Sequence, residues 1–380
     1  MRITAVRPTI VHVNHRGDWV FVEVHTDEGI VGLGEASHSL SDALVVATLR
    51  GFEERLRGRD PHQIQAISAE LTRHDAGRVE HTALSAVEQA LWDILGQSLE
   101  APIHALLGGA IRQRIRLYAN INRHVNDRRP EGFARAAAQA ASEGFAAIKL
   151  APFDELSAPD HVRTGPRAAW MTGVERVRAV REAIGSEVDL MIDCHGRMEE
   201  SEAVRVAQAL RHADLCWYEE PVPHLYPQAL QRITRAIDTP TASAESVFGL
   251  EGFAPFLRER VVDVIMPDVK HDGGIWPTVQ IAAAARLQQL LVAPHNPAGP
   301  VSTAVSGQVV STLPNFAILE YAWGEADWRA ELLDPPERIV DGHLLLPEGP
   351  GLGHRLNPEV VAAYRVDEPS GRDSTKALAV

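Results

Sequence analysis

The sequence contains only two cysteines, Cys194 and Cys216, among 380 residues. Both fall in stretches that we expect to be strands, so they predict buried free thiols in a reducing compartment rather than a disulfide framework. No run of about 18 apolar residues occurs, which argues against a membrane-spanning helix. The first residues alternate like a strand and lack a signal-peptide core, so we expect a cytoplasmic protein.

Positive charge is also scarce in this chain. There are 37 lysines and arginines against 51 aspartates and glutamates, giving a formal net charge of −14. Because no basic run is present, we expect neither nucleic acid nor an anionic membrane as a partner. Apolar residues make up 45% of the chain, which is ordinary for a globular protein with a sizeable core.

Three regions differ in their hydrophobic pattern. Residues 1–36 alternate as a β meander and residues 41–110 turn to helical periodicity, which predicts an N-terminal α+β capping domain over residues 1–112. Residues 113–328 alternate between short apolar runs and helical patterns. Residues 329–380 predict a C-terminal return that packs on the capping domain, with a hairpin at Asp341-Gly342.

The middle region predicts a parallel barrel. Its apolar runs lie at 114–119, 146–150, 188–195, 214–219, 241–246, 262–268, 290–295 and 317–322. Eight strand–helix units in this length fit a (β/α) barrel, which typically has about 250 residues. The pattern becomes irregular after Trp323, so the eighth unit is incomplete.

One polar residue stands at the end of six of these runs. The residues are Asp193, Glu219, Glu245, Asp268, His295 and Glu320. A strand, a helix and two loops need roughly 25 residues, and the observed steps of 23 to 27 residues match this length. The carboxyl ends of barrel strands meet at one mouth, where catalytic groups are found, so we expect the six side chains to gather there.

Three of these residues predict a metal site. Asp193, Glu219 and Glu245 end successive strands, and three carboxylates at one point repel each other unless a cation lies between them. Oxygen ligands favour Mg²⁺ or Mn²⁺. The alternative is three surface carboxylates, each paired with a neighbour, and the matched spacing favours the metal.

Two histidines are candidate catalytic groups. His295 follows Asp268 by one strand, and an aspartate on one ring nitrogen would make the other nitrogen a general base. A histidine satisfied by hydrogen bonds at a loop start is the alternative. His195 lies two residues after Asp193 and could be a fourth ligand, an acid–base group or a bystander. We favour the acid–base role, because three carboxylates already suffice for the cation.

Two further residues are candidate substrate contacts. Glu320, if protonated or hydrogen-bonded, would hold a substrate oxyanion, and a salt bridge at the barrel rim is its alternative. Lys149 ends the second strand and would neutralise a substrate carboxylate, whereas solvent exposure is the common fate of such a lysine.

The chain resembles the enolase superfamily, in its mandelate racemase-like subgroup, and is most similar there to D-galactonate dehydratase and related acid-sugar dehydratases. The resemblance covers nearly the whole chain. Its motifs are DCHGR at 193–197, EEP at 219–221, Glu245, MPDVKHDGG at 266–274, APHNPAGP at 293–300, Glu320 and GPGLG at 349–353. It implies a (β/α)₇β barrel, a modified TIM barrel, with a capping domain formed by the N-terminal region and the C-terminal return.

The resemblance also implies chemistry. Asp193, Glu219 and Glu245 would bind Mg²⁺, and Asp268 with His295 would remove the proton α to a substrate carboxylate. A lysine or histidine base that works beside Mg²⁺ is typical of this superfamily. Loss of the 3-hydroxyl would then give a 2-keto-3-deoxy acid.

Three positions bear on the reaction that the resemblance implies. Racemases of the subgroup carry a second lysine two residues after the position of Lys149, and this chain has Ala151 there. His195 would supply the acid that protonates the leaving hydroxyl. We therefore expect a Mg²⁺-dependent dehydratase that acts on an aldonate or aldarate. We also expect the protein to form homo-oligomers.

Three alternatives remain open. The same site could epimerise or racemise a 2-hydroxy or sugar acid, but Ala151 removes the usual second base. A metal-independent glycosidase would use two barrel carboxylates and would not need Asp268 with His295. A barrel without catalytic activity would bind sugar acids and turn over none of them.

Overall fold

The computed structural model describes residues 1–15, 17–37, 41–73, 76–156 and 169–370. An antiparallel sheet in the order β16-β1-β2-β3 lies in its N-terminal region. The elements here are β1 (Ile3–Asn14), β2 (Gly17–Thr26), β3 (Val31–Glu35), α1 (Asp42–Leu56), α2 (Ile64–Leu71), α3 (Arg78–Ser98) and α4 (Ile103–Leu106). Apolar side chains of the sheet and of α1, α2 and α3 share one core, which confirms the predicted α+β cap.

Eight parallel strands form the barrel. They are β4 (Arg114–Asn120), β5 (Ala147–Leu150), β6 (Asp189–Asp193), β7 (Leu215–Glu219), β8 (Thr241–Ser243), β9 (Val264–Ile265), β10 (Leu291–Val292) and β11 (Leu319–Ala322). Strands β4 to β10 pair in sequence order, and β11 pairs with β4. The N–H of Val292 donates to the Asn315 carbonyl, and the Val292 carbonyl accepts a return bond from the Ala317 N–H, so β10 meets the segment leading to β11.

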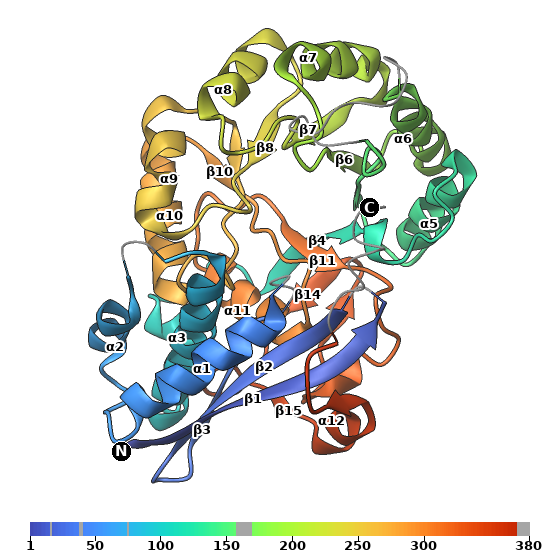
Figure 1. Ribbon diagram of the computed structural model, residues 1–380. Coiled ribbons are helices and arrows are strands. Elements are labelled where there is room, and N and C mark those ends of the chain that lie inside the picture. The colour runs from blue at the N-terminus through green and yellow to red at the C-terminus, as the bar shows by residue number, and fades with distance from the viewer. Residues whose placement is uncertain (16, 38–40, 74–75, 157–168, 371–380) are drawn as a thin grey trace.

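The helices that the structure describes between these strands surround them as an outer ring, as Figure 1 shows. They are α5 (Pro130–Ser142), α6 (Met171–Ile184), α7 (Glu200–Ala209), α8 (Pro227–Ala236), α9 (Gly249–Glu259), α10 (Ile275–Leu287) and α11 (Pro300–Val310). After β11 the described chain has only a short 3₁₀ turn at Ala330–Leu332 before the return. The (β/α)₇β architecture is therefore confirmed.

The barrel strands place alternate side chains on opposite faces. Met191 and Trp217 point inward and belong to the small core inside the barrel. Ile192 and Tyr218, one residue further along, belong to the larger core beneath the outer helices. The same alternation turns Asp193 inward, two residues after Met191, which is why a strand-end carboxylate reaches the mouth.

The C-terminal segment returns across both parts of the molecule. Its elements are β12 (Leu333–Asp334), β13 (Ile339–Val340), β14 (His343–Leu345), β15 (Arg355–Leu356), α12 (Pro358–Tyr364) and β16 (Arg365–Val366). The predicted hairpin joins β13 to β14 through Asp341 and Gly342, both with positive φ. Strand β14 pairs with β4 of the barrel and β16 pairs with β1 of the cap, whereas the predicted boundaries at residues 112 and 328 stay predictions.

The two cysteines are free thiols, as predicted, but only Cys194 is buried, and Cys216 is half-buried. Cys216 lies in β7 as expected, whereas Cys194 follows the end of β6. Across the described residues, no helix is both long enough and apolar enough to cross a membrane.

Candidate active site

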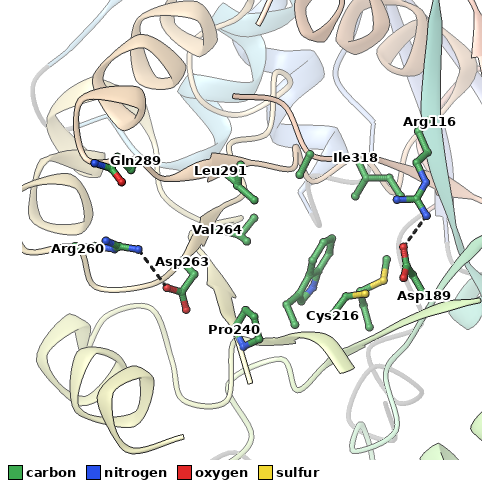
Figure 2. A pocket seen from close by; sticks show the side chains of 13 residues that line it. Arg116, Asp189, Cys216, Pro240, Arg260, Asp263, Val264, Gln289, Leu291 and Ile318 are labelled. Carbon is green, nitrogen blue, oxygen red and sulfur yellow. Dashed lines mark hydrogen bonds and ion pairs between the residues drawn. The ribbon is translucent and has the colours of Figure 1, made fainter. Parts of the chain in front are cut away.

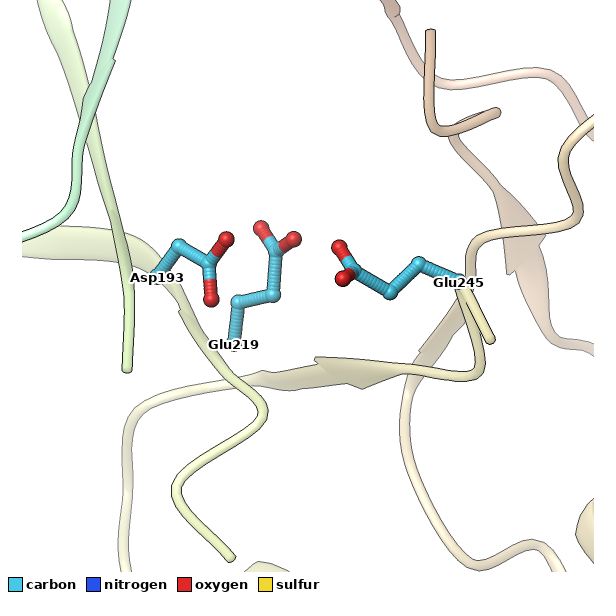
Figure 3. A group of neighbouring side chains, drawn as sticks. All are labelled: Asp193, Glu219 and Glu245. Carbon is cyan, nitrogen blue, oxygen red and sulfur yellow. The ribbon is translucent and has the colours of Figure 1, made fainter. Parts of the chain in front are cut away.

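Asp193, Glu219 and Glu245 converge at the mouth of the barrel. Each offers one carboxylate oxygen, and these three oxygens lie within 4.8 Å of one another. Figure 3 shows the three carboxylates turned toward a common point. The structure thus brings together the three predicted metal ligands.

The backbone delivers these groups in two ways. Asp193 and Glu219 are the last residues of β6 and β7. Glu245 lies two residues beyond the end of β8, after Ala244 with φ +88°, and His195 lies two residues beyond β6 with φ +48°. The predicted strands 188–195 and 241–246 were therefore too long. Left-handed turns, rather than strand alternation, aim the side chains of His195 and Glu245 at the mouth.

The electrostatics of the three carboxylates fit a cation. Burial, together with the charges of Asp193 and Glu320, raises the pKa of Glu219 to about 8, although Lys149 acts in the opposite direction. Burial and the neighbouring carboxylates raise the pKa of Glu245 well above its usual value. Among the described residues, the buried Oε2 of Glu245 has no hydrogen-bond partner. An all-oxygen donor set with this excess of negative charge suits Mg²⁺ or Mn²⁺.

Lys149 and Glu320 lie beside the carboxylates. Lys149 is 1% exposed, so the solvent-exposed alternative is wrong. Its Nζ lies 2.9 and 3.0 Å from the two Glu219 oxygens and 3.2 Å from Glu320 Oε1. Glu320 accepts hydrogen bonds from the Asn296 N–H and the Asn120 amide. Burial disfavours its charge, but Lys149 holds the pKa of Glu320 below its usual value, which favours the ionised form. An ionised carboxylate would repel a substrate oxyanion, so the contact with Lys149 favours the salt-bridge alternative for Glu320.

His295 and Asp268 form a hydrogen-bonded pair. Nδ1 of His295 lies 2.7 Å from Asp268 Oδ2, and Nε2 lies 3.4 Å from Glu245 Oε2. Because the Asp268 carboxylate can only accept, Nδ1–H of His295 donates the hydrogen bond, and Nε2 is left as the acceptor that faces the triad. Burial lowers the pKa of His295, and Asp268 only partly offsets this effect.

His195 lies between two carboxylates. Its Nδ1 is 2.5 Å from Asp154 Oδ1, and its Nε2 is 2.8 Å from Asp193 Oδ2. Desolvation works against the charged ring, but the two carboxylates raise the pKa of His195 well above its usual value. This environment favours an imidazolium, which can donate a proton.

Sequence spacing missed two buried charged groups. Asp154 lies in the loop after β5, outside the regular step, and nothing in its local pattern points to His195. Lys270 lies two residues after Asp268 and holds both of its oxygens, at 2.8 and 2.6 Å. A lysine so close in sequence to a predicted catalytic aspartate was the available signal for this second group.

A cavity of about 380 Å³ lies at the other end of the barrel. Figure 2 shows its lining, with the ion pairs of Arg116 with Asp189 and of Arg260 with Asp263 at its rim. Asp189 begins β6, whereas Asp193 ends it, so this cavity opens at the amino ends of the strands. It is separate from the predicted site.

Residues 2–108 match the mandelate racemase / muconate lactonizing enzyme N-terminal domain, and residues 132–360 match the enolase C-terminal domain-like family. The chain belongs to the enolase superfamily, in its mandelate racemase-like subgroup. A solved superfamily member from Salmonella Typhimurium aligns with a TM-score of 0.87 and 27% identity, over 96% of this chain and 98% of that one.

Curated superfamily relatives include three sugar-acid dehydratases. D-xylonate dehydratase of Haloferax volcanii is 33% identical over 96% of this chain and 89% of its own length. D-gluconate dehydratase of Thermoproteus tenax is 33% identical, covering 92% and 70%. D-galactonate dehydratase of Pectobacterium atrosepticum is 30% identical and covers 93% of each chain.

Proposed function

We propose that this protein dehydrates a sugar acid, an aldonate or aldarate, to a 2-keto-3-deoxy acid with Mg²⁺ as its cofactor and Mn²⁺ as a substitute. The names of the three curated relatives support this class of reaction. The observation that carries the proposal is a single mouth with three convergent carboxylates and two histidines, each hydrogen-bonded to an aspartate.

Asp193, Glu219 and Glu245 would hold the cation through carboxylate oxygens. A proton next to a carboxylate is very weakly acidic, because its removal places two negative charges on one small group; the bound cation spreads that charge. We propose that Lys149 and Glu320 border the substrate, with the Lys149 ammonium offsetting part of the substrate carboxylate's charge.

Two proton transfers complete the proposed reaction. His295 takes the C2 proton on Nε2, while Asp268 holds its Nδ1–H and stabilises the imidazolium that forms. His195 gives a proton to the 3-hydroxyl as the C3–O bond breaks, so one water leaves. The resulting enol tautomerises to the 2-keto-3-deoxy acid, and the sugar acid has lost one water in total.

Epimerisation at the same site is the second candidate, and the surroundings of Lys149 weigh against it. An epimerase needs a base on each face of C2. Lys149 is buried among carboxylates that raise its pKa well above its usual value despite desolvation, so it is a poor base. Ala151 offers no second lysine in its place.

The test is a panel of aldonic and aldaric acids incubated with the protein and Mg²⁺. Formation of a 2-keto-3-deoxy acid from one of them, with His295→Asn as the inactive control, is the expected result. Inversion at C2 without loss of water would support the epimerase instead. No turnover of any acid in a panel that covers the C5 and C6 aldonates and aldarates would contradict the proposal.

We further propose that the protein is a homo-oligomer, since most soluble oligomers are symmetric assemblies of identical chains. Size-exclusion chromatography with light scattering would test this, and a mass near 41.5 kDa, that of one chain, would contradict it.

A further inference from the structure

Helix α3 of the cap presents a polar stripe to the loop that follows Asp268. The side-chain amide of Gln89 donates to the Val269 carbonyl at 3.1 Å. The hydroxyl of Ser85 accepts from the Gly273 N–H at 2.9 Å. Both side chains are fully buried, so each contact satisfies backbone polar groups that have left water.

Thr82, one turn earlier on α3, fixes a buried histidine in the same loop. Thr82 Oγ1 lies 2.8 Å from His271 Nδ1 and donates its own proton to the Arg78 carbonyl. Arg78 Nη2 lies 3.0 Å from His271 Nε2. Because arginine only donates, Nε2 accepts, and Nδ1–H donates to Thr82. Burial lowers the pKa of His271 well below its usual value, which agrees with this neutral ring.

Glu88 holds the far end of the loop. Its two oxygens accept from the N–H groups of Ile275 and Trp276, at 2.7 and 2.9 Å, in the first turn of α10. Helix α10 has Gly274 at its N-cap and no side-chain cap of its own. A Cβ at Gly274 would lie 2.1 Å from Glu88 Oε2, so the glycine admits this carboxylate from the cap.

Asp268 therefore sits at the start of a loop that α3 holds along its length. Asp268 is fully buried, and it is the residue that contacts His295 Nδ1 at 2.7 Å. Because the loop backbone is fixed by hydrogen bonds from another domain, a displacement of α3 or loss of its contacts would move this carboxylate and the histidine that it orients.

We infer that α3 is a positioning element for the base, in which Thr82, Ser85, Glu88 and Gln89 hold the 268–276 loop and thereby Asp268 and His295. The inference rests on the proposed function for the role of His295. The four side chains act through Asp268, so they are positioning residues, and the cap contributes to proton removal as well as enclosing the barrel.

The test compares three variants of α3. Thr82→Val keeps the side-chain shape and removes the acceptor for His271, Thr82→Ser keeps the hydroxyl, and Gln97→Leu is the matched control. Gln97 lies on the same helix and donates its amide to the Val31 carbonyl within the cap. The measurements are kcat, KM, the isotope effect for a substrate deuterated at C2, and amide hydrogen exchange of residues 269–276.

For Thr82→Val we expect kcat to fall roughly tenfold to a hundredfold, as for a misplaced catalytic group, with little change in KM. Its C2 isotope effect should rise and residues 269–276 should exchange faster. Thr82→Ser should restore kcat, and Gln97→Leu should keep it. If Thr82→Val does not fold, Ser85→Ala takes its place with the same expectations.

The inference is overturned if Thr82→Val keeps kcat within about twofold and the loop stays protected. It is equally overturned if Gln97→Leu lowers kcat as much as Thr82→Val does, since the effect would then be a general loss of cap stability. Failure of the wild type to dehydrate any sugar acid would contradict the proposed function alone. The exchange of residues 269–276 would still decide whether α3 holds the loop.

Discussion

Two histidines face the same carboxylates, and their surroundings move their pKa values in opposite directions. His295 is 13% exposed, and burial lowers its pKa. His195 is 37% exposed, and although desolvation lowers its pKa, the carboxylates of Asp193 and Asp154 raise it well above the usual value. A neutral imidazole takes a proton and an imidazolium gives one, so the contrast supports the proposed roles of His295 as the base and His195 as the acid.

An aspartate partner alone does not decide the role of either histidine, since both have one. Asp268 shares its charge with the Lys270 ammonium, which lies within hydrogen-bond distance of both its oxygens. Each histidine also has a second carboxylate near its other ring nitrogen, but Asp193 lies 2.8 Å from His195, whereas Glu245 lies 3.4 Å from His295. The nearer second carboxylate at His195 and the closer cation at Asp268 therefore favour a protonated His195 and a neutral His295.

The largest expected effect is that of metal removal, because in the proposed reaction the cation would spread the negative charge that forms when the C2 proton is removed. Dialysis against EDTA should abolish product formation, and added Mg²⁺ should restore it. A circular dichroism spectrum after dialysis checks that the fold persists. Dehydration that survives chelation would show that the reaction does not need the metal.

Replacement of His295 by Asn should be the next largest effect. The amide fills the same space but cannot take a proton, so product formation and exchange of the C2 proton with solvent should both fall by about 10²- to 10⁴-fold. Thermal unfolding should stay close to that of the wild type. Normal C2 exchange in this variant would show that another group is the base.

Asp154→Asn should affect only the step in which His195 protonates the leaving hydroxyl. The variant removes a negative charge 2.5 Å from His195 Nδ1, so it should lower the pKa of His195 and the fraction of the ring that is protonated. Dehydration should fall roughly tenfold, with C2 exchange unchanged. A matched control is Asp127→Asn, which alters a half-buried carboxylate that is paired with Arg129 and Arg135. Equal loss of exchange and dehydration in Asp154→Asn would break the separation of the two histidines.

The pH dependence of kcat/KM is the subtlest effect. His295 acts when neutral and its pKa is lowered, so the acidic loss of activity should occur below pH 6.5, the usual histidine pKa. His195 acts when protonated and its pKa is raised, so the basic loss should occur well above that value. Asp154→Asn should shift only the basic limb, to lower pH. A narrow maximum centred on the usual histidine pKa would contradict both directions.

The strands of the barrel and the convergence of the carboxylates could be predicted because they follow from spacing. One polar residue at or just after the end of each strand lies at the same mouth, although the turn at Ala244 is needed to aim Glu245. The ends of strands could not be predicted as well, since Ala244 and His195 take a left-handed backbone without the glycine that usually signals it.

The contacts that orient the site could not be predicted from the sequence for a different reason. The loop after β5, which brings Asp154 to His195, is held by Arg128, which donates to the Ala151 carbonyl and lies 3.4 Å from Asp154 Oδ2. Arg176 also holds this loop by donating to the Pro152 carbonyl. Gln89 and Val269 are 180 residues apart, and on its own Gln89 is one polar residue on an amphipathic helix. Such partners depend on the packing of whole elements, which local periodicity does not contain.

The division of labour between the histidines is tested most directly by proton NMR of His195→Asn with Mg²⁺ and an accepted sugar acid in D₂O. We expect deuterium at C2 without a 2-keto-3-deoxy product, because His295 would still remove the C2 proton while the acid for the leaving hydroxyl is missing. Loss of C2 exchange together with product, or full product formation, would contradict this expectation.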